Sequence, residues 1–323
     1  MKQRLCILLL TLVLPLLAVG ADKLTFVPVW TPQTQFAGYY VAQEKGFYAE
    51  EGLDVTISHV GVNSNLVSTD MLQDGSAQIV GMQLLSAMKE RSLGVPLVNV
   101  LQTSQNSALY CVSHTPVTRP EDLNGLKVAS WQSGFSEGFE MMVKDYNLSC
   151  ERVRFIQGVN LYVFGAVDAI LCYSFNEYIQ LLLALGSIPD EQVMKFSEWG
   201  YNFPEDGLYV NEKWLEGHAD EAARFVRASC KGWQYCHQHP EEAMNITMEY
   251  VERYHIATSR VHQKLMLEQV LKTQLNPETG KADFAPISRE RYDQATEKMI
   301  GIGLVDKAIP YDELIHPVSL DKP

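Results

Sequence analysis

The sequence lacks an excess of positive charge: its 323 residues include 26 Lys and Arg against 39 Asp and Glu, a formal net charge of −13. A phosphate backbone would repel such a chain, which argues against a nucleic-acid-binding protein. Glycine and proline, at 21 and 14, are too few for a collagen-like fibre, and 46% hydrophobic residues are too many for a disordered chain. The length allows one large domain or two smaller ones.

Cysteines are few and odd in number beyond the N-terminal segment. Cys6 lies in that segment, and the others are Cys111, Cys150, Cys172, Cys230 and Cys236. Five cysteines cannot all pair within one chain, and their spacing matches no zinc motif. We expect small, buried hydrophobic residues at these positions, and we predict neither a metal site nor a cofactor.

Motifs typical of several enzyme classes are also absent. The sequence contains no GxSxG, GxxxxGK[ST], GxGxxG or HExxH pattern. Glu205 and Asp206 are adjacent carboxylates that we expect to be solvated. The sequence therefore favours a protein that is not an enzyme.

One apolar run, residues 5–19, follows Lys2 and Arg4 and ends before Gly20 and Ala21. A basic start, a short apolar centre and a small-residue exit are typical of a signal peptide. We predict cleavage near Ala21 and a periplasmic or secreted mature protein; the alternative is a retained membrane anchor. The run is short for a bilayer span of about 20 residues.

Strand-like and helix-like periods alternate from residue 24 onward. In the first part we predict strands at 24–30, 53–57, 78–82 and 97–101, separated by helices. A second unit begins near residue 110, with strands at 109–112, 126–130, 154–156 and 167–171. This alternation is typical of an α/β fold with mostly parallel sheets flanked by helices.

From residue 208, which we predict to begin a strand returning to the first unit, the chain becomes almost wholly helical. We infer two lobes joined by a hinge, with a ligand between them. The predicted divisions are residues 1–21 as signal peptide, 22–107 and 208–323 as lobe one, and 108–207 as lobe two. The C-terminal helices are expected to extend lobe one.

The segment 30–48, followed by Glu50-Glu51-Gly52-Leu53-Asp54-Val55, resembles the opening of type II periplasmic solute-binding proteins. The similarity is to the sulfonate-, nitrate- and thiamin-pyrimidine-binding superfamily, which also contains the eukaryotic thiamin-pyrimidine synthase. Residues 74–79, 120–128 and 165–169 match in addition. The resemblance implies the two-lobed type II fold and a small planar, nitrogen-containing ligand such as a thiamin-pyrimidine precursor. It also implies an ABC-transporter permease and ATPase as partners; we expect a monomer.

The chain departs from the synthase at the positions that matter for its chemistry. Gln83 stands where the resemblance would place the pyridoxal-phosphate lysine, and Ala87 where it would place a histidine. Residues 201–206 contain no cysteine, unlike the cysteine-rich segment of the synthase. These departures favour a binding protein over an enzyme.

Candidate ligand-binding residues follow the predicted strands, because loops beyond the carboxyl ends of parallel strands form the crevice of such folds. Aromatic candidates for stacking on a planar ligand are Trp30, Phe36 and Tyr39. Uncharged polar candidates after the third and fourth strands are Gln83, Ser104, Gln105 and Asn106; Gln83 could instead cap a helix or be solvated.

Three further groups come from lobe two. Ser133, Gly134 and Phe135 open a helix, whose N-terminus could bind an anion or be a plain cap. Tyr173, Asn176 and Glu177 follow a strand, and Glu177 could hold an amine or cap the next helix. Trp199 could cover the closed cleft or be buried by packing.

Three hypotheses follow. The first is an exported receptor that delivers its ligand to an importer. The second is an enzyme of the thiamin-pyrimidine-synthase type. The third is a ligand-sensing protein that docks on a membrane receptor.

Overall fold

The computed structural model describes residues 20–60, 67–131, 135–276 and 278–320. The predicted signal peptide lies almost entirely outside these residues. Within the described part of the chain, no helix is both long and apolar enough to cross a membrane.

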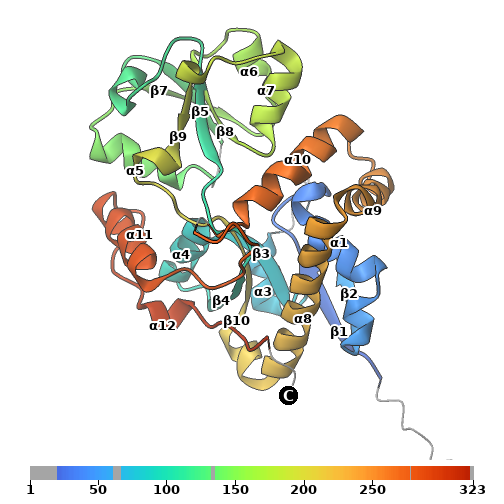
Figure 1. The fold of residues 1–323 in the computed structure, drawn as a ribbon. Helices are drawn as coiled ribbons and strands as arrows, with labels where there is room; N and C mark the ends of the chain where they lie inside the picture. The colour runs from blue at the N-terminus through green and yellow to red at the C-terminus, as the bar shows by residue number, and fades with distance from the viewer. Residues whose placement is uncertain (1–19, 61–66, 132–134, 277, 321–323) are drawn as a thin grey trace, which may run out of the picture.

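Two five-stranded sheets form the centres of two lobes, the lower and upper halves of Figure 1. The strand order in the lower lobe is β2 (Leu53–Ile57), β1 (Asp22–Val27), β3 (Ile79–Gln83), β10 (Asp206–Asn211) and β4 (Leu97–Gln102). Every residue of β3 and β4 is buried, as expected for strands of a sheet covered by helices on both faces.

The upper lobe contains the second sheet. Its order is β7 (Glu151–Phe155), β6 (Lys127–Trp131), β8 (Ala169–Tyr173), β5 (Leu109–Ser113) and β9 (Val193–Lys195). The chain therefore passes from the lower sheet to the upper between β4 and β5, and returns between β9 and β10.

Each sheet has two parallel and two antiparallel strand pairs, so the expectation of mostly parallel sheets requires correction. The antiparallel pairs involve the crossing strands β5 and β10. Strands β3 and β8 end at Gln83 and Tyr173, which pair with Asp206 and Leu109 at the starts of β10 and β5. Strands β5 and β10 enter their lobes from the hinge, at the sheet edge where β8 and β3 end. They therefore run antiparallel to these neighbours.

Helices cover both sheets. The lower lobe contains α1 (Ala37–Glu44), α2 (Phe47–Glu50), α3 (Ser68–Asp74) and α4 (Leu84–Ser92), and the upper lobe α5 (Glu137–Asp145), α6 (Asn160–Val163) and α7 (Glu177–Leu185). The C-terminal helices are α8 (Glu212–Gln238), α9 (Pro240–Arg253), α10 (Arg260–Thr273), α11 (Arg289–Gly301) and α12 (Tyr311–Leu314). Short 3-10 turns are η1 (Thr34–Phe36), η2 (Pro120–Leu123), η3 (Asp190–Gln192) and η4 (Phe196–Trp199).

Helices α1 and α8 cross at two glycines. A Cβ atom built on Gly232 would lie 2.0 Å from the carbonyl oxygen of Gly38, and one built on Gly38 would lie 2.2 Å from Trp233. Only glycine allows the two backbones to approach this closely. The crossing fixes α1, and with it the loop between β1 and α1, against the lower sheet.

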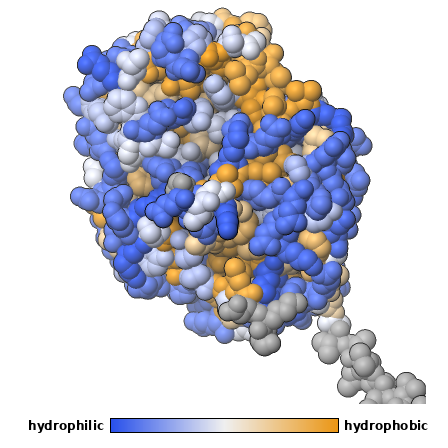
Figure 2. Space-filling model, viewed as in Figure 1, coloured by the Kyte–Doolittle hydropathy of each residue, from blue (hydrophilic) through white to orange (hydrophobic). Residues whose placement is uncertain are grey.

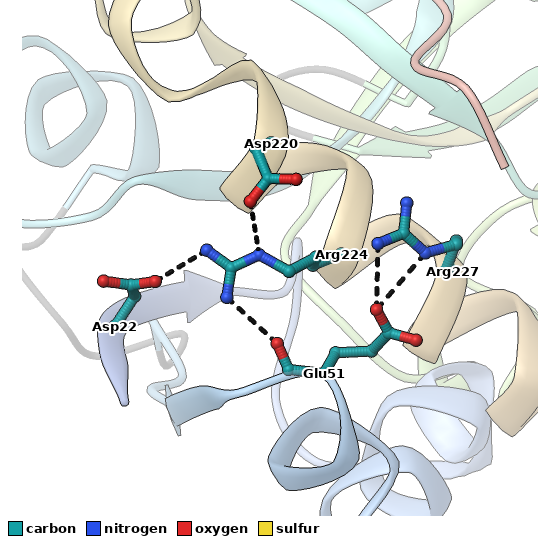
Figure 3. Close-up of polar contacts among 5 residues, drawn as sticks. All are labelled: Asp22, Glu51, Asp220, Arg224 and Arg227. Atoms are coloured by element: carbon teal, nitrogen blue, oxygen red, sulfur yellow. Dashed lines mark hydrogen bonds and ion pairs between the residues drawn. The ribbon is translucent and has the colours of Figure 1, made fainter. Parts of the chain in front are cut away.

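Arginines of α8 fasten the start of β1 to the same lobe (Figure 3). Arg224 donates to Asp22 at 2.6 Å, to Asp220 at 2.7 Å and to the carbonyl of Glu51 at 2.9 Å. Arg227 donates twice to one carboxylate oxygen of Glu51, at 2.9 and 3.3 Å. The long helix thus holds the N-terminal strand and the turn before β2 together.

The C-terminal helices do more than extend lobe one. Helices α10 and α11 flank the waist on opposite sides (Figure 1), where α10 contacts α7 and α11 contacts α5 of the upper lobe. Lys298 of α11 pairs with Asp145 of α5, which also accepts from the Tyr201 hydroxyl at 2.8 Å. After the return strand β10, the C-terminal helices therefore contact elements of both lobes.

Candidate ligand-binding site

A narrow cleft lies between the lobes and is lined by residues of both; we call it the inner cleft. It is reached by the loop after β1 and by the ends of β3, β6 and β8, so both sheets contribute their carboxyl ends. Its lining residues are Val29, Trp30, Gln33, Gln35, Gln83, Trp131, Phe135, Tyr173, Phe175, Asn176 and Glu177.

Aromatic rings from both lobes meet in the inner cleft. Trp30 of the lower lobe contacts Phe135 of the upper lobe edge to face, with ring centroids 5.9 Å apart. Trp131 lies 5.1 Å from Tyr173, which stacks on Phe175 at 5.2 Å. Such faces can hold a planar ring by stacking.

Phe135 has a left-handed backbone conformation, with φ of 61°. This conformation costs a non-glycine residue roughly 1–2 kcal/mol. The ring is packed between Trp30 and Trp131, whose centroids are 5.9 and 6.2 Å from it. The strained backbone of Phe135 therefore lies at the centre of the cleft, where its ring packs against Trp30 and Trp131.

Amide side chains supply polar contacts on the floor of the cleft. Gln83 accepts a hydrogen bond from the Tyr173 hydroxyl at 2.9 Å, across the two lobes. Gln33 donates to Gln35 at 2.6 Å, and Gln35 donates to Asp206 at 2.7 Å. The other oxygen of Asp206, Oδ1, is buried without a hydrogen-bond partner in the described structure.

Glu177 is the first residue of α7 and lines the inner cleft. Its two oxygens accept from the Tyr173 backbone N–H at 3.1 Å and from the Asn176 side chain at 2.9 Å. Burial raises the pKa of Glu177 to about 7. Both hydrogen-bond partners precede α7, so these bonds do not cap the helix, and the pairing of Glu177 with an amine stays a prediction.

Glu205 and Asp206 are not the solvated pair expected from the sequence. Glu205 is buried, and it accepts from the Ser107 hydroxyl at 2.9 Å and the Ala108 backbone N–H at 2.8 Å. Burial raises the pKa of Glu205 to about 8 and that of Asp206 to about 6. The two fall at the start of β10, where the chain re-enters the lower sheet beneath the cleft.

His59 holds the backbone of Trp30 through a hydrogen bond. The sequence alone did not predict a role for this residue. Its Nδ1 donates to the Trp30 carbonyl at 2.6 Å, because a carbonyl can only accept. Its Nε2 can then accept from the Tyr40 hydroxyl at 2.9 Å. Burial lowers the pKa of His59 to about 4, so the ring is neutral near pH 7.

Two aromatic candidates lie outside the inner cleft. Tyr39 is buried against Phe26 and Trp233, with centroids 4.6 and 5.6 Å away. Phe36 is buried beside His59, at 5.8 Å, and lines a smaller cavity beneath the cleft. One turn of helix separates these residues from Trp30, and that turn rotates them towards the core.

Ser104, Gln105 and Asn106 line the hinge instead of the inner cleft. Ser104 accepts from the Glu205 backbone N–H at 2.7 Å. Gln105 donates to the carbonyls of Asp283 and Ala285, and Asn106 donates to that of Leu275. The segment after α10 covers this edge of the sheet. Its carbonyls accept hydrogen bonds from the Gln105 and Asn106 side chains, which the sequence predicts to contact a ligand.

The remaining candidates are settled by position alone. Trp199 lies 6.3 Å from Tyr146, edge to face, and does not line the inner cleft. Ser133 and Gly134 lie outside the described residues. Trp30, Gln83, Phe135, Tyr173, Asn176 and Glu177 are the candidates that the fold brings together.

A wider space, the outer chamber, opens from the inner cleft and encloses about 1400 Å³, including space open to solvent. Its walls come from the loop after β1, from α6 and α7, and from residues 256–263 at the start of α10. Half-exposed Leu183 belongs to its rim. Apolar surface gathers on the same side of the upper lobe in Figure 2.

The NMT1/THI5-like family model matches residues 33–243, nearly two thirds of the chain. The chain belongs to this family. The matched region includes strands β2 to β10 of both lobes. It also includes every residue that lines the inner cleft except Val29 and Trp30.

Named relatives are binding proteins and synthases. The riboflavin-binding protein RibY of Chloroflexus aurantiacus is 22% identical over 89% of this chain and 83% of its own. The formylaminopyrimidine-binding protein of Halalkalibacterium halodurans is 26% identical over 68% of each chain. The 4-amino-5-hydroxymethyl-2-methylpyrimidine phosphate synthase THI13 of Saccharomyces cerevisiae is 23% identical over 72% of each.

The periplasmic aliphatic sulphonate-binding protein SsuA of Escherichia coli has the same fold. Its TM-score is 0.66, at 13% identity and 94% coverage of both chains. The two-lobed periplasmic-binding-protein fold expected from the resemblance is thereby confirmed. The fold and the binding-protein relatives together support a solute-binding role.

The residues of the inner cleft do not fit pyridoxal phosphate as a covalent cofactor. A Schiff base requires a lysine amine, and among the described residues lining the inner cleft there is none. The end of β3 carries Gln83, whose amide cannot form that bond and already accepts from Tyr173.

Proposed function

We propose that this protein is an exported solute-binding protein that closes its two lobes on a small planar, nitrogen-containing molecule. The observation that carries the proposal is the meeting of aromatic rings from both lobes: Trp30 of the lower lobe contacts Phe135 of the upper lobe, beside Trp131 and Tyr173. A ring held between them contacts both lobes at once, and it therefore favours the closed state.

The ligand class follows from the polar groups around these rings. Gln33, Gln35 and Gln83 offer amide donors and acceptors, and Glu177 offers a carboxylate that can pair with ring N–H or amino groups. Nitrogen heterocycles present such edges. Two relatives are named for riboflavin and for formylaminopyrimidine, which are ligands of this class.

Delivery to a permease and its ATPase completes the proposal. Support comes from the N-terminal segment typical of a signal peptide and from the similarity to a periplasmic binding protein. The synthase relatives leave an enzyme as a second candidate, but Gln83 and Ala87 lack the groups that such chemistry would use.

Calorimetry with purified protein and a panel of pyrimidines, flavins, sulfonates and amino-acid derivatives tests the proposal. We expect a planar nitrogen heterocycle to bind and Trp30→Ala to weaken it roughly tenfold or more. Trp214→Ala is the control, because Trp214 stacks on His218 in α8, outside the inner cleft. Preference for an aliphatic sulfonate, or unchanged affinity in Trp30→Ala, would refute the stacking role.

A further inference from the structure

The polar lining of the outer chamber consists mostly of amides and hydroxyls, with Glu177 and His262 as its ionisable side chains. Side chains that present these groups come from the loop after β1, from α6, from α7 and from the start of α10. They include Gln33, Gln157, Asn160, Gln180, Thr258 and Gln263.

Positive charge is missing from this lining. Among the described residues that line the outer chamber, none is Lys or Arg. Arg260, in the first turn of α10, is exposed and donates to Asn245 on α9. Phosphate and sulfonate groups are usually held by Arg, Lys or several backbone N–H groups.

The ionisable groups that do line the chamber disfavour an anion. Glu177 carries a carboxyl at the passage between the inner cleft and the chamber. His262 is buried, which lowers its pKa and keeps it neutral near pH 7. At the start of α10, the Ser259 hydroxyl accepts from the His262 backbone N–H, so this helix N-terminus is capped by the protein itself.

We propose that the outer chamber is a second subsite, which binds an uncharged hydroxyl- or amide-bearing chain attached to the ring in the inner cleft and rejects phosphorylated forms. This subsite rests on the proposed function, because the ring must enter the inner cleft for its chain to reach the chamber. Hydroxyl groups both donate and accept, and they therefore match side-chain amides, which do the same.

The walls of the outer chamber explain why the ligand's hydroxyl- or amide-bearing chain would favour closure of the two lobes. Gln33 belongs to the lower lobe, Gln180 to α7 of the upper lobe and Gln263 to α10. Gln263 is held in place, since it accepts from the Thr34 backbone N–H at 2.7 Å and donates to Thr258 at 3.0 Å. A chain that bonds to all three walls adds contacts found only when the lobes are closed.

Two sets of probes separate the subsite from the ring site. Lumichrome, riboflavin and FMN share a dimethylated tricyclic ring system, which is an alloxazine in lumichrome and an isoalloxazine in the other two. They carry no chain, a ribityl chain and a phosphorylated ribityl chain, respectively. The second set is 4-amino-5-hydroxymethyl-2-methylpyrimidine and its phosphate. Dissociation constants are measured by calorimetry on the full mature protein. We expect riboflavin to bind at least tenfold more tightly than lumichrome and than FMN, and the pyrimidine alcohol more tightly than its phosphate.

A charge added to the chamber should reverse the rejection. Gln157→Lys places an amine at the exposed rim, and we expect it to raise the affinity for FMN about tenfold relative to the affinity for riboflavin. The control is Gln73→Lys, the same substitution on α3, away from the chamber. Equal affinity for alcohol and phosphate in the unmodified protein, or equal affinity for lumichrome and riboflavin, would overturn the subsite but not the ring site. Binding of no ring from either set would overturn the proposed ligand class and the subsite with it.

Discussion

The Tyr173 hydroxyl donates to the Gln83 side chain at 2.9 Å, joining the ends of β8 and β3 across the two lobes. A second bond, from Ser86 to Glu137 at 3.0 Å, crosses the same gap. The lobes are thus held together by protein groups even without a ligand contact, and ligand binding competes with or adds to these bonds.

Removing the Tyr173 hydroxyl tests this link. We expect Tyr173→Phe to lower the free energy of unfolding by about 1 kcal/mol, because the buried Gln83 oxygen loses its partner while the ring is retained. Small-angle scattering should show a larger radius of gyration for the ligand-free variant. An unchanged radius would show that this bond does not hold the lobes closed.

Arg291 of α11 binds both crossing segments of the hinge. It donates to the carbonyl of Gln105 at 2.9 Å and to that of Asn202. We expect Arg291→Ala to lower the free energy of unfolding by roughly 1–3 kcal/mol, because two carbonyls lose a charged donor.

Arg289→Ala is the matched control for the hinge contact. Arg289 lies on the same helix and pairs with exposed Asp312, and such surface pairs contribute at most about 1 kcal/mol. Denaturant melts of both variants decide the point. Equal effects would mean that Arg291 stabilises α11 and not the hinge.

Glu205 should make stability depend on pH. Its folded pKa, about 8, lies above its ordinary value of 4.5, so the folded state binds the proton more tightly. Its contribution to the free energy of unfolding is fully present below pH 4.5 and is lost as the pH rises towards 8. Glu205→Gln keeps an acceptor for Ser107 and Ala108 but cannot ionise. We expect the variant to gain at least about 1 kcal/mol relative to the unmodified protein between pH 5 and pH 9, measured by urea unfolding. A constant difference would show that Glu205 does not titrate in this range.

The helix crossing in the lower lobe gives a prediction about stability alone. We expect Gly232→Ala to cost roughly 3 kcal/mol, because its methyl group would overlap the Gly38 carbonyl. Gly217→Ala in the same helix meets no atom within 4 Å and should be neutral or slightly stabilising. Thermal unfolding compares the two; similar melting temperatures would show that the helices can move apart at little cost.

Local patterns were sufficient for most helices and strands. The pattern in 53–57 predicted β2 at its observed bounds. Strand β9 was not predicted, because three residues at a sheet edge leave little periodic signal.

Some of the candidate residues lie together in the inner cleft and others do not, and the difference has one cause. Gln83 and Tyr173 are the last residues of β3 and β8, and Trp30 lies in the loop after β1, so the order of the strands fixes where they lie. Tyr39 and Gln105 lie where a helical turn or a distant segment decides the environment. Periodicity in the sequence does not record that residues 273–291 return to cover the hinge.

The sequence by itself determined the order of the elements, the family, and the aromatic and amide character of the strand ends, because these depend on neighbouring residues. Tertiary structure alone decided that Glu205 is buried, that His59 supports Trp30 and that the sheets are half antiparallel. Each of these features depends on contacts between segments more than 20 residues apart in the sequence. Only the folded structure brings these segments together, and their burial there decides the environment of each side chain.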